Sequence, residues 1–227
     1  PSCEAGVEFA RSAARLKEEG LLLNIGLSEV SAPWLRCAHA VHPICCIQQE
    51  WSLLTRTLED ALAPTCRELG IGIVAYSPLA RNLLTVPKER PSDARRALIP
   101  RFNEQNWEKN VDMLRRLEEL AKSRAASPAQ LSLAWLVQKA KDLKVDCLPI
   151  PGTSNLHHAK SNIASMKVIL SASDMRLLEE LAANVAGARE NDSYLKPRLE
   201  GQMARRAELQ STLCCGLSCF SGIRSLL

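Results

Sequence analysis

Short apolar runs alternate with longer amphipathic stretches along most of the chain. The apolar runs are rich in Ile, Leu and Val and have the length of buried strands. The longer stretches repeat apolar residues at the spacing of one helix face. The expected strands are Leu21–Leu27, Ile44–Glu50, Ile71–Tyr76 and Val145–Ile150, and the expected helices are Glu4–Glu19, Ser31–Ala40, Leu58–Leu69, Gln105–Ser123, Pro128–Ala140, Leu156–Ser165 and Asp174–Val185. This alternation predicts an α/β fold in which βα units form a parallel sheet.

Capping residues mark several of the expected helix ends. Ser127 and Gln130 have the spacing of a capping box, in which each side chain bonds the backbone N–H of the other residue. Ser171 and Asp174 mark a second helix start of this type. Gly70 follows a helical stretch at a position where left-handed backbone commonly ends a helix.

Two segments lack a clear repeat. Ala80–Pro100 is rich in Pro, Arg and polar residues, and we expect a long loop of the kind that often serves as a lid. Periodicity weakens from Gly187 onward, so we expect residues 189–227 to form a poorly ordered C-terminal tail. The apolar end of this tail is too short and too interrupted to cross a bilayer, and no membrane span is expected.

Composition and charge limit the classes of function. Of the 227 residues, 46% are hydrophobic and 24% are charged, which is typical of globular proteins. The net charge of +4 is spread along the chain without aromatic residues between the basic pairs, so nucleic-acid binding is not expected. The residues after Pro1 lack the pattern of a signal peptide, and we expect a cytoplasmic protein.

Nine cysteines are scattered along the chain, and we expect reduced thiols rather than a disulfide framework. Cys45 and Cys46 are neighbours on an expected strand and would point to opposite faces. Cys214, Cys215 and Cys219 have no histidine nearby. The sequence therefore predicts no metal site.

Polar and aromatic residues close the first three expected strands. Ser28 and Gln48 can hydrogen-bond a carboxamide, and Tyr76 can stack on a ring. Ligands of parallel βα folds bind at the carboxyl ends of the strands, which favours a binding site here. The alternative interpretation is that strand ends are polar because they meet solvent, and that Tyr76 only packs within the fold.

The fourth expected strand leads through residues 152–155, Gly-Thr-Ser-Asn, into a helix. Free backbone N–H groups and hydroxyls at a helix start stabilise an anion such as phosphate. An ordinary Ser/Asn helix cap is the equal alternative. The histidines are expected to be exposed or capping residues rather than acid–base catalysts: His39, His42, His157 and His158.

Six sequence blocks follow one another in order: IGLSEVSAPWLRCAHAVHPI, IQQEWSLLTR, CRELGIGIVAYSPLA, PRFNEQNWEKN, SPAQLSLAWLVQ and PIPGT. Their order and spacing resemble the C-terminal half of the aldo-keto reductases. The resemblance covers residues 1–188 and implies a partial (β/α)8 TIM barrel, strands five to eight with their helices. A complete barrel needs roughly 250 residues and the chain starts at Pro1, so we expect a truncated domain.

The resemblance implies a role for the residues at each strand end. Ser28 and Gln48 would hold the nicotinamide carboxamide, and Tyr76 would stack on the nicotinamide ring. The pyrophosphate would lie beside Ser77, Pro78, Leu79 and Arg81, the adenosine 2′-phosphate beside Gly152, Thr153 and Ser154, the adenine beside Asn162, and the substrate beside Trp51.

The chain departs from the family pattern at specific positions. Ala80 and Asn82 flank Arg81 where the family commonly has glycine on both sides, so β-carbons occupy positions where the backbone should approach phosphate. After Gly-Thr, Ser154 stands where the family often has Lys or Arg, and Ser161 replaces an acidic residue. The implied cofactor is NADP, with NAD as the alternative.

The implied activity is the NAD(P)H-dependent reduction of aldehydes or ketones, in which a hydride passes from the nicotinamide to a small carbonyl substrate. The family's catalytic Asp, Tyr, Lys and His belong to strands one to four, and no residue here maps onto them. We therefore expect no catalytic residue in this chain and no activity of the fragment alone. Two other hypotheses are a noncatalytic nucleotide-binding regulatory subunit of this fold and a half barrel that dimerises.

Overall fold

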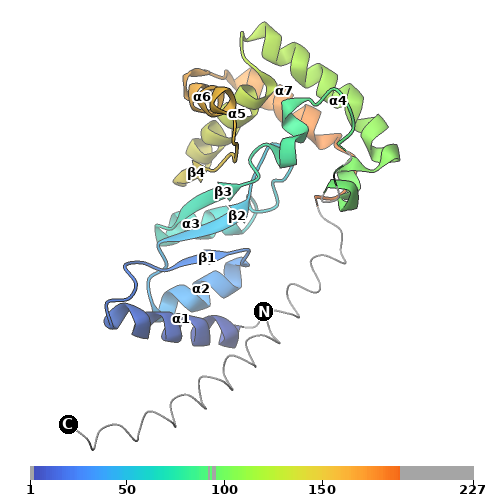
Figure 1. Ribbon diagram of the computed structural model, residues 1–227. Helices are drawn as coiled ribbons and strands as arrows, with labels where there is room; N and C mark the ends of the chain where they lie inside the picture. The colour runs from blue at the N-terminus through green and yellow to red at the C-terminus, as the bar shows by residue number, and fades with distance from the viewer. Residues whose placement is uncertain (1–2, 92, 94–95, 190–227) are drawn as a thin grey trace, which may run out of the picture. The chain divides into compact units, whose positions relative to one another are not determined.

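The computed structural model describes residues 3–91, 93 and 96–189, and the statements below concern these residues (Figure 1). The strands lie side by side, in chain order and parallel: β1 (Gly26–Ser28), β2 (Cys46–Glu50), β3 (Gly72–Tyr76) and β4 (Cys147–Pro149). The predicted α/β class and the predicted strands are thereby confirmed. Each strand begins later than its apolar run, because residues such as Leu21 and Leu23 precede the paired segment and are exposed.

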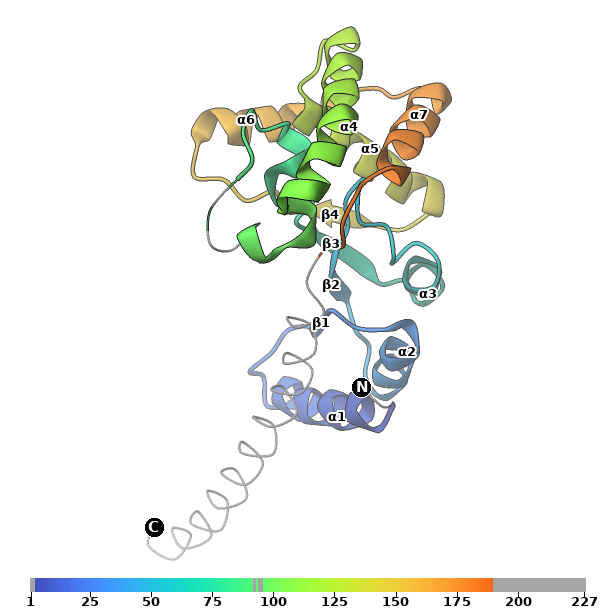
Figure 2. The same cartoon turned by 90° about the vertical axis from the view of Figure 1, so that its right-hand side faces the viewer.

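Helices fill the connections between the strands. They are α1 (Cys3–Glu18), α2 (Ala32–Val41), α3 (Leu62–Leu69), α4 (Glu104–Ser123), α5 (Pro128–Leu143), α6 (Leu156–Ala164) and α7 (Ala172–Ala183). Each lies on a predicted helical stretch, although α3 begins at Leu62 rather than at Leu58. Figure 2 shows α2 and α3 on the same side of the strands.

The capping residues act as the sequence predicts. Ser127 and Gln130 form a complete capping box at the start of α5, and Ser171 and Asp174 form another at the start of α7. Gly70 ends α3 in the left-handed conformation, with φ of 66° and its N–H donating to the carbonyl of Cys66. Local chemistry therefore fixes these helix boundaries.

The strand register places different side chains on the two faces of the sheet. One row is buried in a core shared with α2 and α3: Leu27, Ile47 and Ile73. The neighbouring row lies on the opposite face: Ser28, Gln48, Val74 and Leu148. Leu148 is 63% exposed, and Ser28 and Gln48 are exposed as well. The sheet therefore has one packed face and one open face, with β1 and β4 as its edges.

The segment after β3 is more ordered than its composition suggests. It contains the short 3₁₀ helices η1 (Ala80–Thr85), η2 (Arg96–Leu98) and η3 (Pro100–Phe102). Leu83, Leu84 and Phe102 are fully buried. The prediction of a long loop over residues 80–100 is wrong for these parts, because a few apolar side chains anchor an otherwise polar segment.

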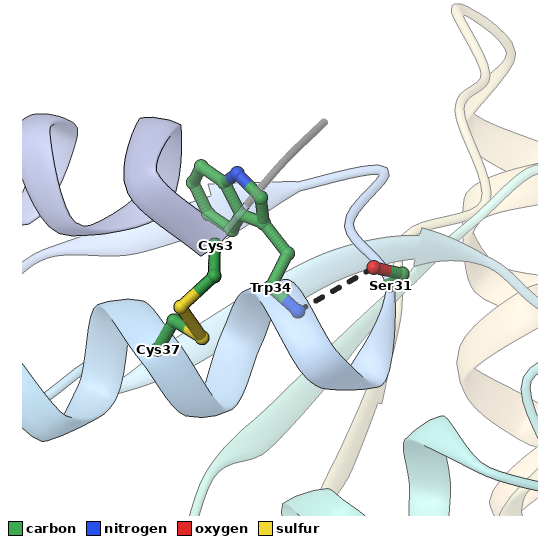
Figure 3. Close-up of a disulfide and its surroundings, with 4 residues drawn as sticks. All are labelled: Cys3, Ser31, Trp34 and Cys37. Atoms are coloured by element: carbon green, nitrogen blue, oxygen red, sulfur yellow. Dashed lines mark hydrogen bonds between the residues drawn. A yellow bond between two sulfur atoms is a disulfide. The ribbon is translucent and has the colours of Figure 1, made fainter.

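A disulfide between Cys3 and Cys37 joins α1 to α2, as Figure 3 shows. The expectation that every cysteine is reduced is wrong for this pair, which lies 34 residues apart in the sequence and 5.6 Å apart between Cα atoms. The helices approach closely here, since a β-carbon on Gly6 would lie 3.2 Å from the Trp34 ring. The cytoplasmic location, which we expect from the residues after Pro1, stays a prediction.

Cys45 precedes β2 rather than belonging to it, so the prediction that the side chains of Cys45 and Cys46 point apart is wrong: their sulfurs are 3.7 Å apart. Among the described residues there is no group of three or more His, Cys, Asp and Glu side chains placed to hold a metal ion. Cys214, Cys215 and Cys219 lie outside the described residues, as does the tail from residue 190 onward. Within the described part, no helix is long and apolar enough to cross a membrane.

Two helix ends provide a matched stability test. Lys144 caps α5 with φ of 57°, in the left-handed conformation that a β-carbon disfavours, and its side chain is exposed. Lys144→Gly should raise the free energy of unfolding by about 1 kcal/mol, and Gly70→Ala should lower it by about the same amount. Urea denaturation measures both, and changes of equal sign would contradict this account of the two caps.

Candidate functional site

The residues predicted to hold a nicotinamide lie together at the carboxyl edge of the sheet. Ser28 and Gln48 are register partners on β1 and β2. Glu50 and Tyr76 are register partners on β2 and β3, one step closer to the strand ends on the same face. Parallel pairing therefore brings the side chains of Ser28, Gln48 and Tyr76 to one edge, although they are far apart in the sequence.

A cluster of charged side chains surrounds Tyr76. The Tyr76 hydroxyl donates to Glu29 Oε1 at 2.7 Å. Arg189 donates to Glu29 Oε2 at 3.0 Å and to Glu50 Oε2 at 3.1 Å. No pattern in the sequence indicates Glu29, Glu50 or Arg189 as site residues, because Arg189 is 160 residues from Glu29 and no spacing rule connects them.

Burial and pairing act on the two carboxylates with different results. The side chain of Glu50 is buried, and burial raises its pKa even though Arg189 and Arg81 favour the charged form. For Glu29 burial also opposes ionisation, but hydrogen bonds from Arg189 and Tyr76 outweigh it and lower the pKa. Burial, together with Glu29, raises the pKa of the Tyr76 phenol, so the hydroxyl remains a donor at neutral pH.

The turn after β3 adopts the left-handed conformation at consecutive non-glycine positions. The φ angles are 49° at Ala80, 56° at Arg81 and 75° at Asn82. Ala80 and Asn82 stand where the resemblance implies glycine, so the turn keeps a glycine-type backbone at a cost of about 1 kcal/mol or more per strained residue. The Arg81 guanidinium lies 3.9 Å from Glu50 Oε2.

A cavity of about 550 Å³ lies between η1, the start of α5 and the start of α6. Its lining includes the predicted residues Leu79, Gly152, Thr153, Ser154 and Asn162 together with Asn82, Thr85, Ser127, Ser161, His157 and His158. Ser77, Pro78 and Arg81 do not line it. The lining is rich in hydroxyl and amide groups, and among the described residues it contains no Lys, Arg, Asp or Glu side chain.

The residues before α6 form the cap that the sequence predicts and also open onto this cavity. The Asn155 side chain accepts from the backbone N–H groups of His157 at 2.8 Å and His158 at 3.4 Å. Both histidines are exposed, as predicted, but they also line the cavity. The same segment is therefore both a helix cap and part of the cavity wall, so a cap does not exclude the predicted phosphate site.

Trp51 lies inside the protein. Its side chain is fully buried, and the indole N–H donates to Glu59 Oε1 at 3.0 Å. In this arrangement the ring packs in the core and does not line the cavity. Its implied place beside a substrate has no contact in this geometry to support it.

The segment after α7, residues 186–189, is called the C-terminal strap below. The Ala186 N–H donates to Asn110 Oδ1 at 2.7 Å, and Arg101 Nε donates to the Gly187 carbonyl at 3.2 Å. Gly187 has φ of 87°, and an added β-carbon would lie 2.8 Å from the backbone nitrogen of Arg101. Only glycine fits this contact, and the strap delivers Arg189 to the carboxyl edge of the sheet.

Comparison with known proteins identifies a family model and relatives that match most of this chain. The model of the Aldo/keto reductase family matches residues 7–183. The curated protein "Probable aldo-keto reductase 1" from Glycine max is 44% identical over 180 residues, which cover 77% of this chain and 51% of that protein. The chain therefore spans about half the length of this relative.

Solved structures give the same grouping. The thermostable aldo-keto reductase Tm1743, solved with the inhibitor epalrestat, has a TM-score of 0.58 and 27% identity over 78% of this chain and 54% of that chain. The glycerol dehydrogenase AKR11B4 from Gluconobacter oxydans has a TM-score of 0.63 over 79% of this chain and 55% of that chain, and at 23% identity it supports the fold alone.

The strap contact can be tested by substitution. Gly187→Ala should lower the free energy of unfolding by about 2 kcal/mol, because the methyl group collides with backbone and the residue leaves a favourable conformation. Gly152→Ala is the matched control, since an added β-carbon there meets nothing within 4 Å. Urea denaturation measures both, and equal midpoints would show that the strap is not packed as described.

Proposed function

Because this chain belongs to the aldo-keto reductase family, we propose that it binds a nicotinamide dinucleotide along the carboxyl edge of its sheet and serves the reduction of an aldehyde or ketone. The observation that carries the proposal is the arrangement of two complementary surfaces along one edge. Ser28, Gln48 and Tyr76 lie at one end, and the polar cavity beside β4 and α6 lies at the other.

The donor set fits the two ends of such a cofactor. At the nicotinamide end, the Ser28 hydroxyl and the Gln48 amide would bond the carboxamide, and the Tyr76 ring would offer a flat surface to the nicotinamide. At the other end, Thr153 and Ser154 supply hydroxyls beside the start of α6 for a phosphate, and Asn162 would contact the adenine. Ser77, Pro78, Leu79 and Arg81 would follow the pyrophosphate between them.

The bound cofactor would supply the hydride, and these residues would hold its reactive ring in place. Tyr76 is not proposed as a proton donor to the substrate, since its hydroxyl is engaged by Glu29. We propose that the general acid comes from barrel strands other than the four that the structure describes. A noncatalytic role is not favoured, because the similar proteins of higher identity are named as aldo-keto reductases.

NADPH binding tests the nicotinamide end. The 227-residue chain should bind NADPH in a fluorescence titration, and Tyr76→Ala should weaken binding about tenfold through loss of the stacking surface. Arg36→Ala, which breaks an exposed ion pair with Glu68, is the control and should leave the affinity unchanged. Equal affinity of the Tyr76→Ala and wild-type proteins would contradict the proposed placement.

An enzyme assay tests whether this chain binds the cofactor without supplying the general acid. We expect no NADPH oxidation by residues 1–227 in the presence of a reactive aromatic aldehyde, because a hydride transfer without a general acid has no assisted path. The measurement is absorbance at the reduced-nicotinamide band with monodisperse protein. Clear turnover that Tyr76→Ala abolishes would contradict the proposal, because it would show that this chain itself carries the catalytic groups.

Charge in the cavity tests the choice between NADP and NAD. We propose weak discrimination, because the part of the lining that the structure describes contains no Lys or Arg. Ser154→Lys should strengthen NADPH binding about fivefold by pairing with the 2′-phosphate and leave NADH binding unchanged. Ser154→Gln controls for side-chain length, and an equal gain for both cofactors would place the 2′-phosphate elsewhere.

A further inference from the structure

We infer that Arg189 is a positioning residue, which holds the Tyr76 ring through Glu29 in the orientation that receives the nicotinamide. This inference rests on the proposed cofactor site and adds to it a residue outside every strand-end loop. The contacts form a continuous chain: Arg189 donates to Glu29 Oε2 at 3.0 Å, and Tyr76 donates to Glu29 Oε1 at 2.7 Å. The two oxygens of one carboxylate therefore join the C-terminal strap to the ring.

Glu29 is held firmly enough to transmit this restraint. Its backbone N–H donates to the Gln48 carbonyl at 3.0 Å, and its Oε1 also accepts from the Glu50 N–H at 3.2 Å. Its φ of 50° lies in the left-handed region, which a residue with a β-carbon keeps only when its surroundings determine it. The carboxylate thus bridges the ends of β1, β2 and β3.

The Tyr76 ring needs such a restraint to act as a flat binding surface. A tyrosine side chain turns about two bonds, and Tyr76 is only partly buried. A hydrogen bond from its hydroxyl to a charged acceptor is stronger than one between neutral groups. With the hydroxyl held at one end and the β-carbon at the other, the position of the ring and the direction of its long axis are set before the ligand arrives, which reduces the cost of binding.

Arg189 is the residue on which this restraint depends. In the described part of the chain, it is the cation that forms an ion pair with Glu29. Arg101 is committed to the Leu54 carbonyl and to Thr55 Oγ1. Because Arg189 also pairs with Glu50 at 3.1 Å, its removal leaves two neighbouring carboxylates without their shared cation, and Glu29 is then expected to turn away and release the hydroxyl of Tyr76.

The test separates the two ends of the cofactor. In the full 227-residue chain, Arg189→Ala should weaken NADPH binding about fivefold and leave 2′,5′-ADP binding unchanged, since that ligand lacks the nicotinamide. Arg189→Lys keeps one positive charge and should recover part of the NADPH affinity. Arg36→Ala also removes an arginine that pairs with a glutamate, but far from Tyr76 in the fold, and it should change neither affinity. Calorimetric titration measures all four proteins.

A spectroscopic readout follows the ring itself. The chain has two tyrosines, so incorporation of fluorotyrosine gives two ¹⁹F signals, and Tyr76→Phe identifies the signal of Tyr76. Arg189→Ala should move this signal toward that of free fluorotyrosine at a temperature where the protein remains folded, and Arg189→Lys should move it less.

Each contrary result has a distinct meaning. An unmoved Tyr76 signal, or unchanged NADPH affinity in Arg189→Ala, overturns the inference. Equal losses of NADPH and 2′,5′-ADP binding show a general structural role and overturn it as well. If the wild-type chain binds neither ligand, the proposed function fails, whereas the ¹⁹F shift still decides whether Arg189 holds the ring.

Discussion

In a parallel sheet every strand ends at the same edge, and the candidate site of this protein depends on that constraint. The hydrogen-bonded register aligns Ser28 with Gln48 and Glu50 with Tyr76. Side chains alternate between faces, so a slip of one residue would turn Gln48 toward the helices. Burial of Leu27, Ile47 and Ile73 on the helix side opposes such a slip. The hydrophobic core therefore determines which polar groups face a ligand.

The end of β2 is held by a second group of contacts on the side of the core. Trp51 donates to Glu59, which also accepts hydrogen bonds from Arg56 Nε and Nη2. The Arg56 guanidinium lies 5.3 Å from the centre of the Trp135 ring on α5, a cation–π arrangement. Arg56 further pairs with Glu179 on α7 at 3.2 Å. These contacts fix the segment after Glu50, which stabilises the strand end where the charged cluster is built.

The charged cluster at the carboxyl edge carries an energetic cost that its own members offset. A buried carboxylate such as Glu50 is destabilising unless cations and hydrogen bonds compensate for the lost water. Thr55 donates to its Oε1, and Arg189 donates to its Oε2. Since Arg189 reaches this position only through the C-terminal strap, packing after the last helix is coupled to the geometry of the sheet edge. Loss of the strap would leave both Glu29 and Glu50 poorly compensated.

The sequence alone determined the features that depend on neighbouring residues. The alternation of apolar runs with amphipathic stretches predicted the parallel strands and the helices, and the capping boxes at Ser127 and Ser171 predicted two helix starts. The strand ends at Ser28, Gln48 and Tyr76 could be named as a candidate site because strand order and direction follow from this alternation. The assignment of these strands to positions five to eight of a barrel stays a prediction.

Contacts between residues far apart in the sequence were decided only by the tertiary structure. No local pattern indicated that Cys3 would meet Cys37, that Trp51 would be buried against Glu59, or that Arg189 would pair with Glu29. The left-handed turn at Ala80–Asn82 was also hidden, because alanine and arginine rarely adopt that conformation and Asn82 alone does not specify it for three residues. Local propensity depends on a few adjacent residues, whereas these contacts depend on how helices and strands pack, and packing exists only once the whole fold has formed.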